Sequence, residues 1–387
     1  MKQKYMRFTI ILLSILCLLY PISAPCYAVV TPDNDAVTVS AKSAILIDQT
    51  TGTVLYEKNA DEKMPPASIT KIMTMLLVME ALDAGKITLS DPVTGSENAA
   101  SMGGTQIWLE VGETFTVDEM LKACAIASAN DASMALAEFV GGSETAFVAM
   151  MNEKAKALGM ENTVFVNPTG LDANGHLSTA RDISIMSREL LSHPAITNYT
   201  TVWMDSLRGG EMGLVNTNKL VRFYNGCTGL KTGTTDGAGS CLSASATRDN
   251  LSLIAVVMGC KTSKERFADA RALLDYGFAS FEQYTPTLPE DLPKTIPVTG
   301  GMALSVRIKP GEMTGVLLRK GESASVTIDT AYAQSMQAPI HAGDELGTIT
   351  YRREDETICQ IPLLAAEEVE ALSFIRALAK LFYHLWQ

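Results

Sequence analysis

Two residues three positions apart combine a nucleophile with a base. Ser68 and Lys71 stand in the stretch PPASITKIMT, where an apolar run with helical spacing begins, so their side chains share one helix face. A serine hydroxyl is a weak nucleophile until an adjacent base takes its proton. A lysine among apolar side chains can act as that base, because burial lowers its pKa. The spacing therefore lets the Ser68 hydroxyl and the Lys71 amine touch, and a lysine in such a place needs a partner or a task.

Two later stretches supply polar partners for this pair. Ser128 and Asn130 stand in ASANDAS, inside a helix expected over residues 117–142, and Lys-Thr-Gly at 231–233 stands in GLKTGTTDGAGS, which has a strand pattern. Each motif alone is weak, because such short patterns occur by chance and a lone lysine is usually solvated. Their order along the chain is more specific, since Ser-x-x-Lys, Ser-x-Asn and Lys-Thr-Gly together mark serine enzymes that react with β-lactams.

On these motifs the chain resembles the low-molecular-mass penicillin-binding proteins, specifically the serine D-Ala-D-Ala carboxypeptidases of the peptidase S11-like family. The same resemblance extends over ASANDASMALAEFV, NPTGLDANGHLSTARD, GLKTGTTDGAGSCLSASAT and the surroundings of Arg266. It covers nearly the whole chain after the first 28 residues. One departure is Ala129, where the familiar second motif has aspartate, at the position whose side chain is least needed chemically.

The resemblance implies a function and its partners. The enzyme would release the terminal D-Ala from peptidoglycan pentapeptide stems through an acyl-enzyme on Ser68, and β-lactam antibiotics would acylate the same serine. It would need no cofactor and no metal. Asn130 would orient Lys71 and donate to the substrate amide, while Ser128 would relay a proton to the leaving amine near the cation Lys231.

The resemblance also implies where the substrate binds. The backbone N–H groups of Ser68 and Thr234 would form the oxyanion hole. The catalytic candidates are thus Ser68, Lys71, Ser128, Asn130 and Lys231. The substrate-binding candidates are Thr232, Gly233, Thr234 and Arg266, and all of these except Gly233 are candidates for contact with the terminal carboxylate.

The elements that must position these residues follow an α+β order. Strands are expected within residues 43–60, around a Thr51-Gly52 turn, and again within 226–260. Helices are expected between them and after them, at residues 68–84, 117–142, 145–160, 183–191 and 263–281. Residues 29–283 are therefore predicted to form one β-lactamase/transpeptidase-like catalytic domain, whose sheet is completed by distant parts of the chain.

The remainder of the chain changes character twice. A proline-rich linker is expected over residues 284–292, and the alternating patterns of 293–363 predict a small all-β sandwich domain. In residues 365–387, Ser373, Arg376, Lys380 and His384 fall on one narrow polar stripe. This predicts an amphipathic helix that lies on a membrane surface. A helix docked on the protein's own core is the alternative.

The first 28 residues have the layout of a secretory signal peptide. Three cations precede the apolar run FTIILLSILCLLY, and small residues lead to an expected cleavage after Ala28. A retained membrane anchor is the alternative. We therefore expect an exported protein at the outer face of the bacterial cytoplasmic membrane or in the cell wall, attached peripherally by its C-terminal helix.

Charge and metal-ligand spacing exclude other functions. The net charge is −12, and loss of the first 28 residues would make it −15; without a cationic block, nucleic acid is not an expected partner. Five scattered cysteines would remain, which favours neither a zinc site nor a disulfide framework, although pairing of Cys227 with Cys241 stays open. The histidines have no metal-binding spacing. Asp172 and His176 are expected to be structural, in a loop that can border the cleft.

Two rival functions share these motifs. A class A β-lactamase would need a deacylating glutamate in an E-x-x-L-N pentad between Asn130 and Lys231, and the sequence has none. A penicillin-sensing or wall-binding protein would be acylated without turnover, and release of D-Ala from a pentapeptide would distinguish it from an enzyme. Transpeptidase or endopeptidase activity at the same site also stays open.

Overall fold

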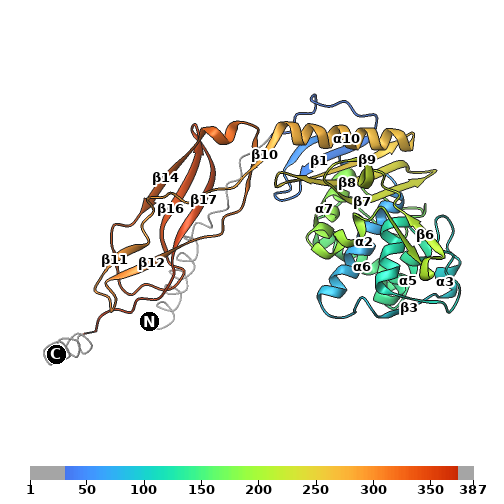
Figure 1. The fold of residues 1–387 in the computed structure, drawn as a ribbon, viewed down its shortest axis with the longest axis horizontal. Coiled ribbons are helices and arrows are strands. Elements are labelled where there is room, and N and C mark those ends of the chain that lie inside the picture. Colours follow the sequence, from blue (N-terminus) through green and yellow to red (C-terminus); the bar gives the residue numbers. More distant parts are fainter. Residues whose placement is uncertain (1–30, 374–387) are drawn as a thin grey trace, which may run out of the picture. The chain divides into compact units, whose positions relative to one another are not determined.

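The computed structural model describes residues 31–373, and in them the chain divides into two compact units (Figure 1). The first unit ends at Gln283 and the second begins at Tyr284, with strand β10 (Phe281–Tyr284) at the division. Each unit has its own hydrophobic core. Within the described range, no helix has the length and hydropathy needed to span a bilayer. The expected signal peptide lies outside the described residues.

A five-stranded antiparallel sheet is the framework of the first unit. The strand order is β2-β1-β9-β8-β7, so strands from both ends of the unit meet in one sheet, and β7 lies at its edge. This confirms the prediction that distant parts of the chain complete the sheet, including the hairpin around Thr51-Gly52. The strands are β1 (Ser43–Asp48), β2 (Val54–Lys58), β7 (Cys227–Thr235), β8 (Gly239–Arg248) and β9 (Leu251–Cys260).

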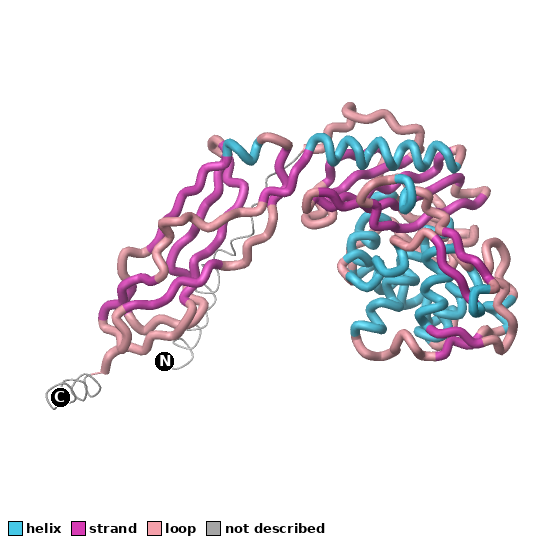
Figure 2. Tube along the Cα trace, in the orientation of Figure 1, coloured by secondary structure: helices cyan, strands magenta, loops and turns pink. Residues whose placement is uncertain are grey.

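Helices cover both faces of this sheet (Figures 1 and 2). The long helix α10 (Ser263–Ser280) packs on one face, and α7 (Ala180–Leu191) packs on the other, together with the helical block that carries most of the core. That block contains α2 (Lys71–Asp83), α4 (Val117–Lys122), α5 (Asn130–Gly141) and α6 (Glu144–Ala157). The helix positions agree with the sequence prediction within a few residues, apart from the one correction below.

Short elements connect these helices and strands. Two small antiparallel strand pairs border the helical block, β3 with β4 and β5 with β6. Their strands are β3 (Pro92–Thr94), β4 (Thr114–Thr116), β5 (Met204–Leu207) and β6 (Met212–Val215). The short helices are α3 (Glu97–Ala100), α8 (Thr197–Thr200) and α9 (Leu220–Phe223), and the 3-10 turns are η1 (Ala67–Thr70), η3 (Pro194–Ile196) and η4 (Arg208–Gly210).

The single helix expected over residues 117–142 is wrong. The chain forms α4, widens into the π-helical turn η2 (Ala123–Ala127), and then breaks at Ser128, which adopts the left-handed conformation with φ of 68°. Ala129 is extended, and α5 starts at Asn130. Continuous apolar spacing hides this break, because the contacts that stabilise it come from distant segments. π-Turns of this kind occur often at functional sites.

The second unit is all-β, as predicted. Its six-stranded sheet has the order β14-β16-β17-β12-β11-β15, and Val316 and Leu318 of β13 pack against Tyr351 and Ile361 of that sheet. β13 pairs with β10 in a second, two-stranded sheet, so the larger sheet packs against a much smaller one. The strands are β11 (Thr295–Thr299), β12 (Ser305–Pro310), β13 (Val316–Arg319), β14 (Val326–Tyr332), β15 (Met336–Gln337), β16 (Glu345–Arg353) and β17 (Glu356–Ala365), and η5 (Glu322–Ser325) precedes β14.

The helix expected over residues 365–387 does not begin at residue 365. Ala365 ends β17, and the chain then stays extended through bridges from Val369 to Ile340 and from Ala371 to Gly301. Val369 is buried in the core of the β unit, so its side chain fixes this segment to the sheet. Sequence patterning missed this because a short apolar and acidic stretch fits either conformation. The rest of the predicted helix, residues 374–387, lies outside the described residues.

Candidate active site

Ser68 lies in a tight turn rather than in an α-helix. The 3-10 turn η1 holds it, Ala67 before it has φ of 49°, and the α-helix starts only at Lys71. The prediction that Ser68 lies in the first turn of an α-helix is therefore wrong, because this turn is a 3-10 turn. The three-residue spacing still places the side chains of Ser68 and Lys71 together. Ser68 is half-buried, so its hydroxyl stays accessible from one side.

Lys71 is fully buried and makes three polar contacts. Its Nζ lies 3.1 Å from Ser68 Oγ, 2.6 Å from Asn130 Oδ1 and 2.6 Å from the carbonyl oxygen of Thr169. Burial lowers the pKa of the Lys71 amine to about 8. A neutral amine has two N–H bonds and one lone pair. Since the two carbonyl-type oxygens can only accept, the lone pair of the neutral form faces the Ser68 hydroxyl.

The break in the α4–α5 segment allows Asn130 to lie beside Lys71. Asn130 is the first residue of α5, and its side chain accepts from Lys71 while its Nδ2 donates to the carbonyl of Gly103 at 2.7 Å. The amide oxygen of Asn130 thus accepts from a donor, and its amide nitrogen donates to an acceptor. Ser128 is buried at the left-handed break. In a continuous helix, helical periodicity would set the directions of the Ser128 and Asn130 side chains.

The edge strand β7 brings the third motif to the same place. Lys231 is buried, its Nζ donates to the carbonyl of Thr232, and burial followed by the nearby Lys71 charge holds the pKa of Lys231 well below its usual range. Thr232 donates to Thr217 Oγ1 at 2.7 Å. Thr234 is the exposed residue of this stretch. The amine of Lys231 therefore lies within the electrostatic influence of Lys71.

Gly233 permits the close approach of β7 to the serine turn. A Cβ at this position would lie 3.0 Å from the carbonyl oxygen of Pro66 and 3.0 Å from the backbone nitrogen of Ser68. Any larger residue would push the strand away from Ser68. The contact brings the backbone of the strand next to the backbone nitrogen of Ser68.

Arg266 lies under the strand, where it holds the backbone. Its Nη1 donates to the carbonyl of Gly233 at 2.9 Å, to Thr234 Oγ1 at 2.8 Å and to the carbonyl of Cys241 at 3.3 Å. The side chain is buried, and burial lowers its pKa. The structure therefore places Arg266 in contact with Thr234, which is one of the predicted carboxylate-binding residues.

The loop of residues 167–176 supplies contacts that sequence reasoning did not identify. Its Thr169 carbonyl is a partner of Lys71, and a backbone carbonyl has no signature in a sequence. Gly170, with φ of 83°, lies so close to the serine turn that a Cβ there would come within 1.9 Å of the Ala67 oxygen. Asp172 accepts from Thr235 Oγ1 at 2.7 Å, which links this loop to the end of β7.

His176 connects the same loop to the serine turn. Its Nδ1 accepts from the backbone N–H of Val166 at 3.0 Å, so Nε2 carries the proton and donates to Thr70 Oγ1 at 2.8 Å. Burial lowers the pKa of His176 to about 4. The imidazole is thus neutral at physiological pH, and it anchors Thr70, which lies between Ser68 and Lys71 in the sequence.

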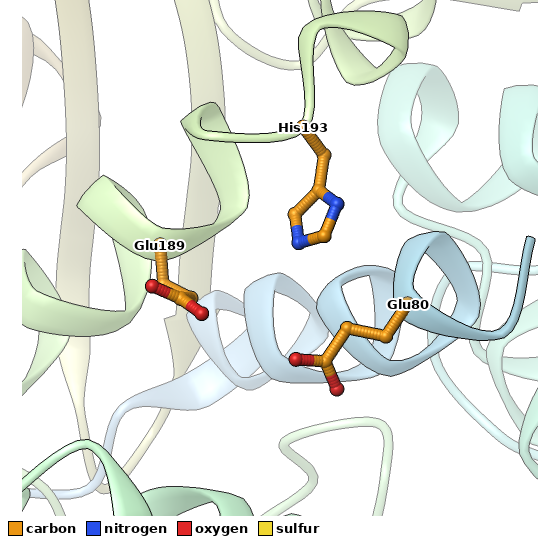
Figure 3. A group of neighbouring side chains, drawn as sticks. All are labelled: Glu80, Glu189 and His193. Carbon is orange, nitrogen blue, oxygen red and sulfur yellow. The ribbon is translucent and has the colours of Figure 1, made fainter. Parts of the chain in front are cut away.

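A separate cluster has side chains of the kind that bind metals. Ligand atoms of Glu80, Glu189 and His193 lie within 4.8 Å of one another (Figure 3). Lys154 Nζ, however, lies 2.5 Å from Glu80 and 2.8 Å from Glu189, and His193 contacts Asp83. Lys154 already forms an ion pair with each of the two glutamates, so we describe this cluster as an ion-pair network that fixes α6 to α2 and α7.

Two other features lie apart from the catalytic candidates. A cavity of about 610 Å³ opens between the β1–β2 hairpin and α7, lined among others by Ile47, Arg181 and Arg188, and none of the catalytic candidates borders it. The five cysteines among the described residues are all free, so Cys227 and Cys241 do not pair here. This cavity is therefore separate from the contacts around Lys71.

Comparison with known proteins matches this arrangement to one family. A family model described as D-alanyl-D-alanine carboxypeptidase matches residues 28–262, and a second, described as penicillin-binding protein 5, C-terminal domain, matches residues 281–371. The D-alanyl-D-alanine carboxypeptidase DacF of Bacillus subtilis is 47% identical over 344 residues, covering 88% of each chain. DacC of Escherichia coli, with the same descriptive name, is 38% identical over 88% of this chain and 87% of its own length.

Solved structures give the same result. The crystal structure of penicillin-binding protein 5 from Haemophilus influenzae superposes with a TM-score of 0.74 at 30% identity, covering 88% of this chain and 99% of that one. Penicillin-binding protein D2 from Listeria monocytogenes in its ampicillin-bound form has a TM-score of 0.58 at 34% identity, over 62% of this chain and 99% of that one. With its two matching domains, its site geometry and these relatives, the chain belongs to the D-alanyl-D-alanine carboxypeptidase family.

Proposed function

We propose that this protein is a serine D-alanyl-D-alanine carboxypeptidase that removes the terminal D-Ala from peptidoglycan pentapeptide stems through an acyl-enzyme on Ser68. One observation carries the proposal. A buried amine, that of Lys71, lies 3.1 Å from the Ser68 hydroxyl with a pKa lowered to about 8. An amine with this pKa is partly neutral near physiological pH, where it can take the serine proton.

Acylation would begin with that proton transfer. Ser68 Oγ attacks the carbonyl carbon of the penultimate D-Ala, and its proton passes to Lys71. The developing negative charge falls on the carbonyl oxygen, toward which the backbone N–H groups of Ser68 and Thr234 would point. Removing one such donor from an enzyme typically costs about 2.7–4 kcal/mol of transition-state stabilisation.

The leaving D-Ala needs a proton on its amine. Ser128, at the left-handed break, is the proposed relay, and Lys231 is the proposed source of positive potential beside it. Because burial and Lys71 hold the pKa of Lys231 low, the site by itself disfavours two ammonium groups. A substrate carboxylate bound at Thr232 and Thr234 would add a negative charge and so favour the charged form of Lys231.

Deacylation would use water and the same base. Lys71, once it has passed its proton on, can accept another from an incoming water molecule, which then attacks the acyl carbon. The rival β-lactamase assignment has no support in the structure, since the loop that contacts Lys71 presents the Thr169 carbonyl and no carboxylate to it. The substrate-binding roles of Thr232, Gly233, Thr234 and Arg266 rest on their position at the edge strand β7.

The test of the function is release of D-Ala by the protein as it exists after export. The expected result is free D-Ala from diacetyl-Lys-D-Ala-D-Ala, lost together with labelling by fluorescent penicillin in Ser68→Ala. A wild-type protein that is labelled but releases no D-Ala would be a penicillin sensor, which would overturn the enzymatic assignment. Stoichiometric labelling of Ser68→Ala would mean that the nucleophile is a different residue.

We also propose export and peripheral membrane attachment. The first 28 residues supply the signal-peptide pattern, and FIRALAKLFYHLWQ at residues 374–387 supplies an amphipathic pattern rich in aromatic side chains. Because Val369 is part of the β-unit core, truncation must follow Ser373 to leave that unit intact. The mature chain should sediment with liposomes at low and high salt, and the truncated chain should stay in solution with unchanged turnover of small peptides. Mature full-length protein that stays in the supernatant would contradict the attachment.

A further inference from the structure

Trp108 is an exposed aromatic residue in a conformation that bulky residues rarely adopt. It lies in the irregular segment between α3 and β4, its side chain is 74% exposed, and its φ is 57°. A non-glycine residue in the left-handed region is strained, and such strain persists only where the surroundings fix it. An isolated exposed apolar residue needs no explanation, but an indole held out to solvent by a strained backbone does.

The backbone on both sides of Trp108 is fixed by two charged side chains. The buried carboxylate of Asp131 accepts from the backbone N–H groups of Ile107, at 3.0 Å, and Leu109, at 3.0 Å. From the other side, Arg208 donates to the carbonyls of Ile107 and Trp108 at 2.9 and 3.1 Å. The side chains of Ile107 and Leu109 are both buried. The indole between them is therefore presented on a rigid support.

Arg208 itself is held in place by an ion pair. Its Nε and Nη2 each donate to Glu113, at the end of the same segment, at 2.8 Å. Arg208 belongs to η4, the turn between β5 and β6, so this turn and the segment with Trp108 form one connected border of the unit. Val111 is exposed on the same border. Rigid support of an aromatic group lowers the entropy cost of binding to it.

The Trp108 segment is continuous with the active site. Asn130 accepts from Lys71 and also contacts residues 103–105, donating from Nδ2 to the Gly103 carbonyl and from its backbone N–H to the Thr105 carbonyl, both at 2.7 Å. A Cβ on Gly104 would lie 2.8 Å from Asn130 Nδ2. The next residue, Asp131, holds residues 107–109. Two consecutive residues of α5 thus fix the wall of the site and the support of Trp108.

The length of chain between Thr105 and Trp108 can be compared with the length of the peptide stem of the substrate. Trp108 follows Thr105 by three residues, so its backbone lies within about 11 Å of the residue that Asn130 contacts. A pentapeptide stem in extended form covers about 3.3–3.6 Å per residue, so the four residues before the scissile bond span about 14 Å. The backbone of Trp108 therefore lies within one extended stem length of the residue that Asn130 contacts, so the indole is within reach of the sugar end of a stem bound beside Asn130.

We propose that Trp108 is a contact residue for the glycan of the polymeric substrate. The apolar C–H face of an N-acetylated hexosamine stacks on the exposed indole, while the attached stem enters the site beside Asn130. Aromatic side chains with one wet and one apolar face suit such amphipathic ligands. The proposal rests on the proposed function, since the glycan is part of the same substrate. It adds that the enzyme prefers stems that are still attached to sugar.

The experiment compares two substrates that differ only in the sugar. D-Ala release is measured for free pentapeptide and for disaccharide-pentapeptide, with the wild type, Trp108→Ala, Trp108→Tyr and Phe223→Ala. Phe223 is a matched control, because it is also an exposed aromatic residue of the same unit, at 61% exposure. We expect Trp108→Ala to lower kcat/KM for the disaccharide form about tenfold, through KM, and to leave the free pentapeptide unchanged. Trp108→Tyr should retain most of the activity.

Each other outcome has a defined meaning. Equal activity of the wild type and Trp108→Ala on the disaccharide form overturns the proposal. An equal loss on both substrates also overturns it, because Trp108 would then maintain the shape of the site, and a melting temperature more than a few degrees lower would support that explanation. A wild-type protein inactive on both substrates would instead refute the proposed function, which separates the two failures.

Discussion

Gly170 is the position at which a single methyl group should test the geometry of the site. It lies in the loop that contacts Lys71, and it faces backbone atoms of the serine turn. A Cβ there would lie 1.9 Å from the Ala67 oxygen, 2.4 Å from the Ala67 carbonyl carbon and 2.9 Å from the Ser68 nitrogen. Gly170→Ala must therefore move the loop, the turn, or both.

The size of that movement sets the expected effect. Real Cβ atoms essentially never come within 3.0 Å of such neighbours, so the two segments must separate by about 1 Å. A displacement of about 1 Å in a reacting group can cost about 10²-fold in rate. The positive φ of 83° adds strain of about 1–2 kcal/mol for any residue with a Cβ. We expect acylation to slow about 100-fold, with a moderate loss of stability.

Gly175→Ala separates the two effects. Gly175 belongs to the same stretch and has a similar φ of 81°, but a Cβ there would meet nothing within 4 Å. It should therefore show the strain without the clash. The assay is the second-order rate of labelling by fluorescent penicillin, with kcat/KM for diacetyl-Lys-D-Ala-D-Ala and thermal unfolding measured beside it. If both variants acylate at similar rates, the packing of this loop does not set the position of Ser68.

Three further predictions concern named contacts. The rate of acylation should rise with pH toward a plateau above about 8, since neutral Lys71 is the base. Lys71→Arg should lower this rate at least 10²-fold while retaining the fold. A flat profile between pH 6 and 9 would exclude Lys71 as the titrating base. The pKa of His176 is lowered to about 4 in the folded state, so the stabilisation by the neutral imidazole is fully present above pH 6.5 and is lost as the pH decreases. The free energy of unfolding, measured by urea titration, should therefore drop by about 2 kcal/mol between pH 7.5 and 5. His176→Gln should lose that part of the pH dependence. Arg266→Ala leaves Thr234 Oγ1 without this donor and leaves the Gly233 carbonyl with the Thr234 hydroxyl as its remaining side-chain donor. We expect kcat/KM for small peptides to fall about 10- to 100-fold. Unchanged kinetics would show that the strand holds its geometry without Arg266.

Local patterns in the sequence determined the chemistry and most of the elements. The spacing of Ser68 and Lys71 survives a change from α-helix to 3-10 turn, because both conformations bring residues three apart to one side. The strands around Lys231 and the long helix after them are bounded by clear turn and capping residues, so these elements were predictable. The division of the chain follows from a change in composition that is visible in the sequence.

Tertiary structure alone decided how the site is completed. Ser128 breaks a segment with uninterrupted helical patterning, because Asn130 and Asp131 bind distant backbone groups that a continuous helix could not reach. The Thr169 carbonyl beside Lys71 has no signature in the sequence, since every residue carries a carbonyl and only the path of the loop selects one. The segment after β17 is extended instead of helical for a similar reason. Its backbone pairs with strands that are remote in the chain, and local propensity contains no information about such partners.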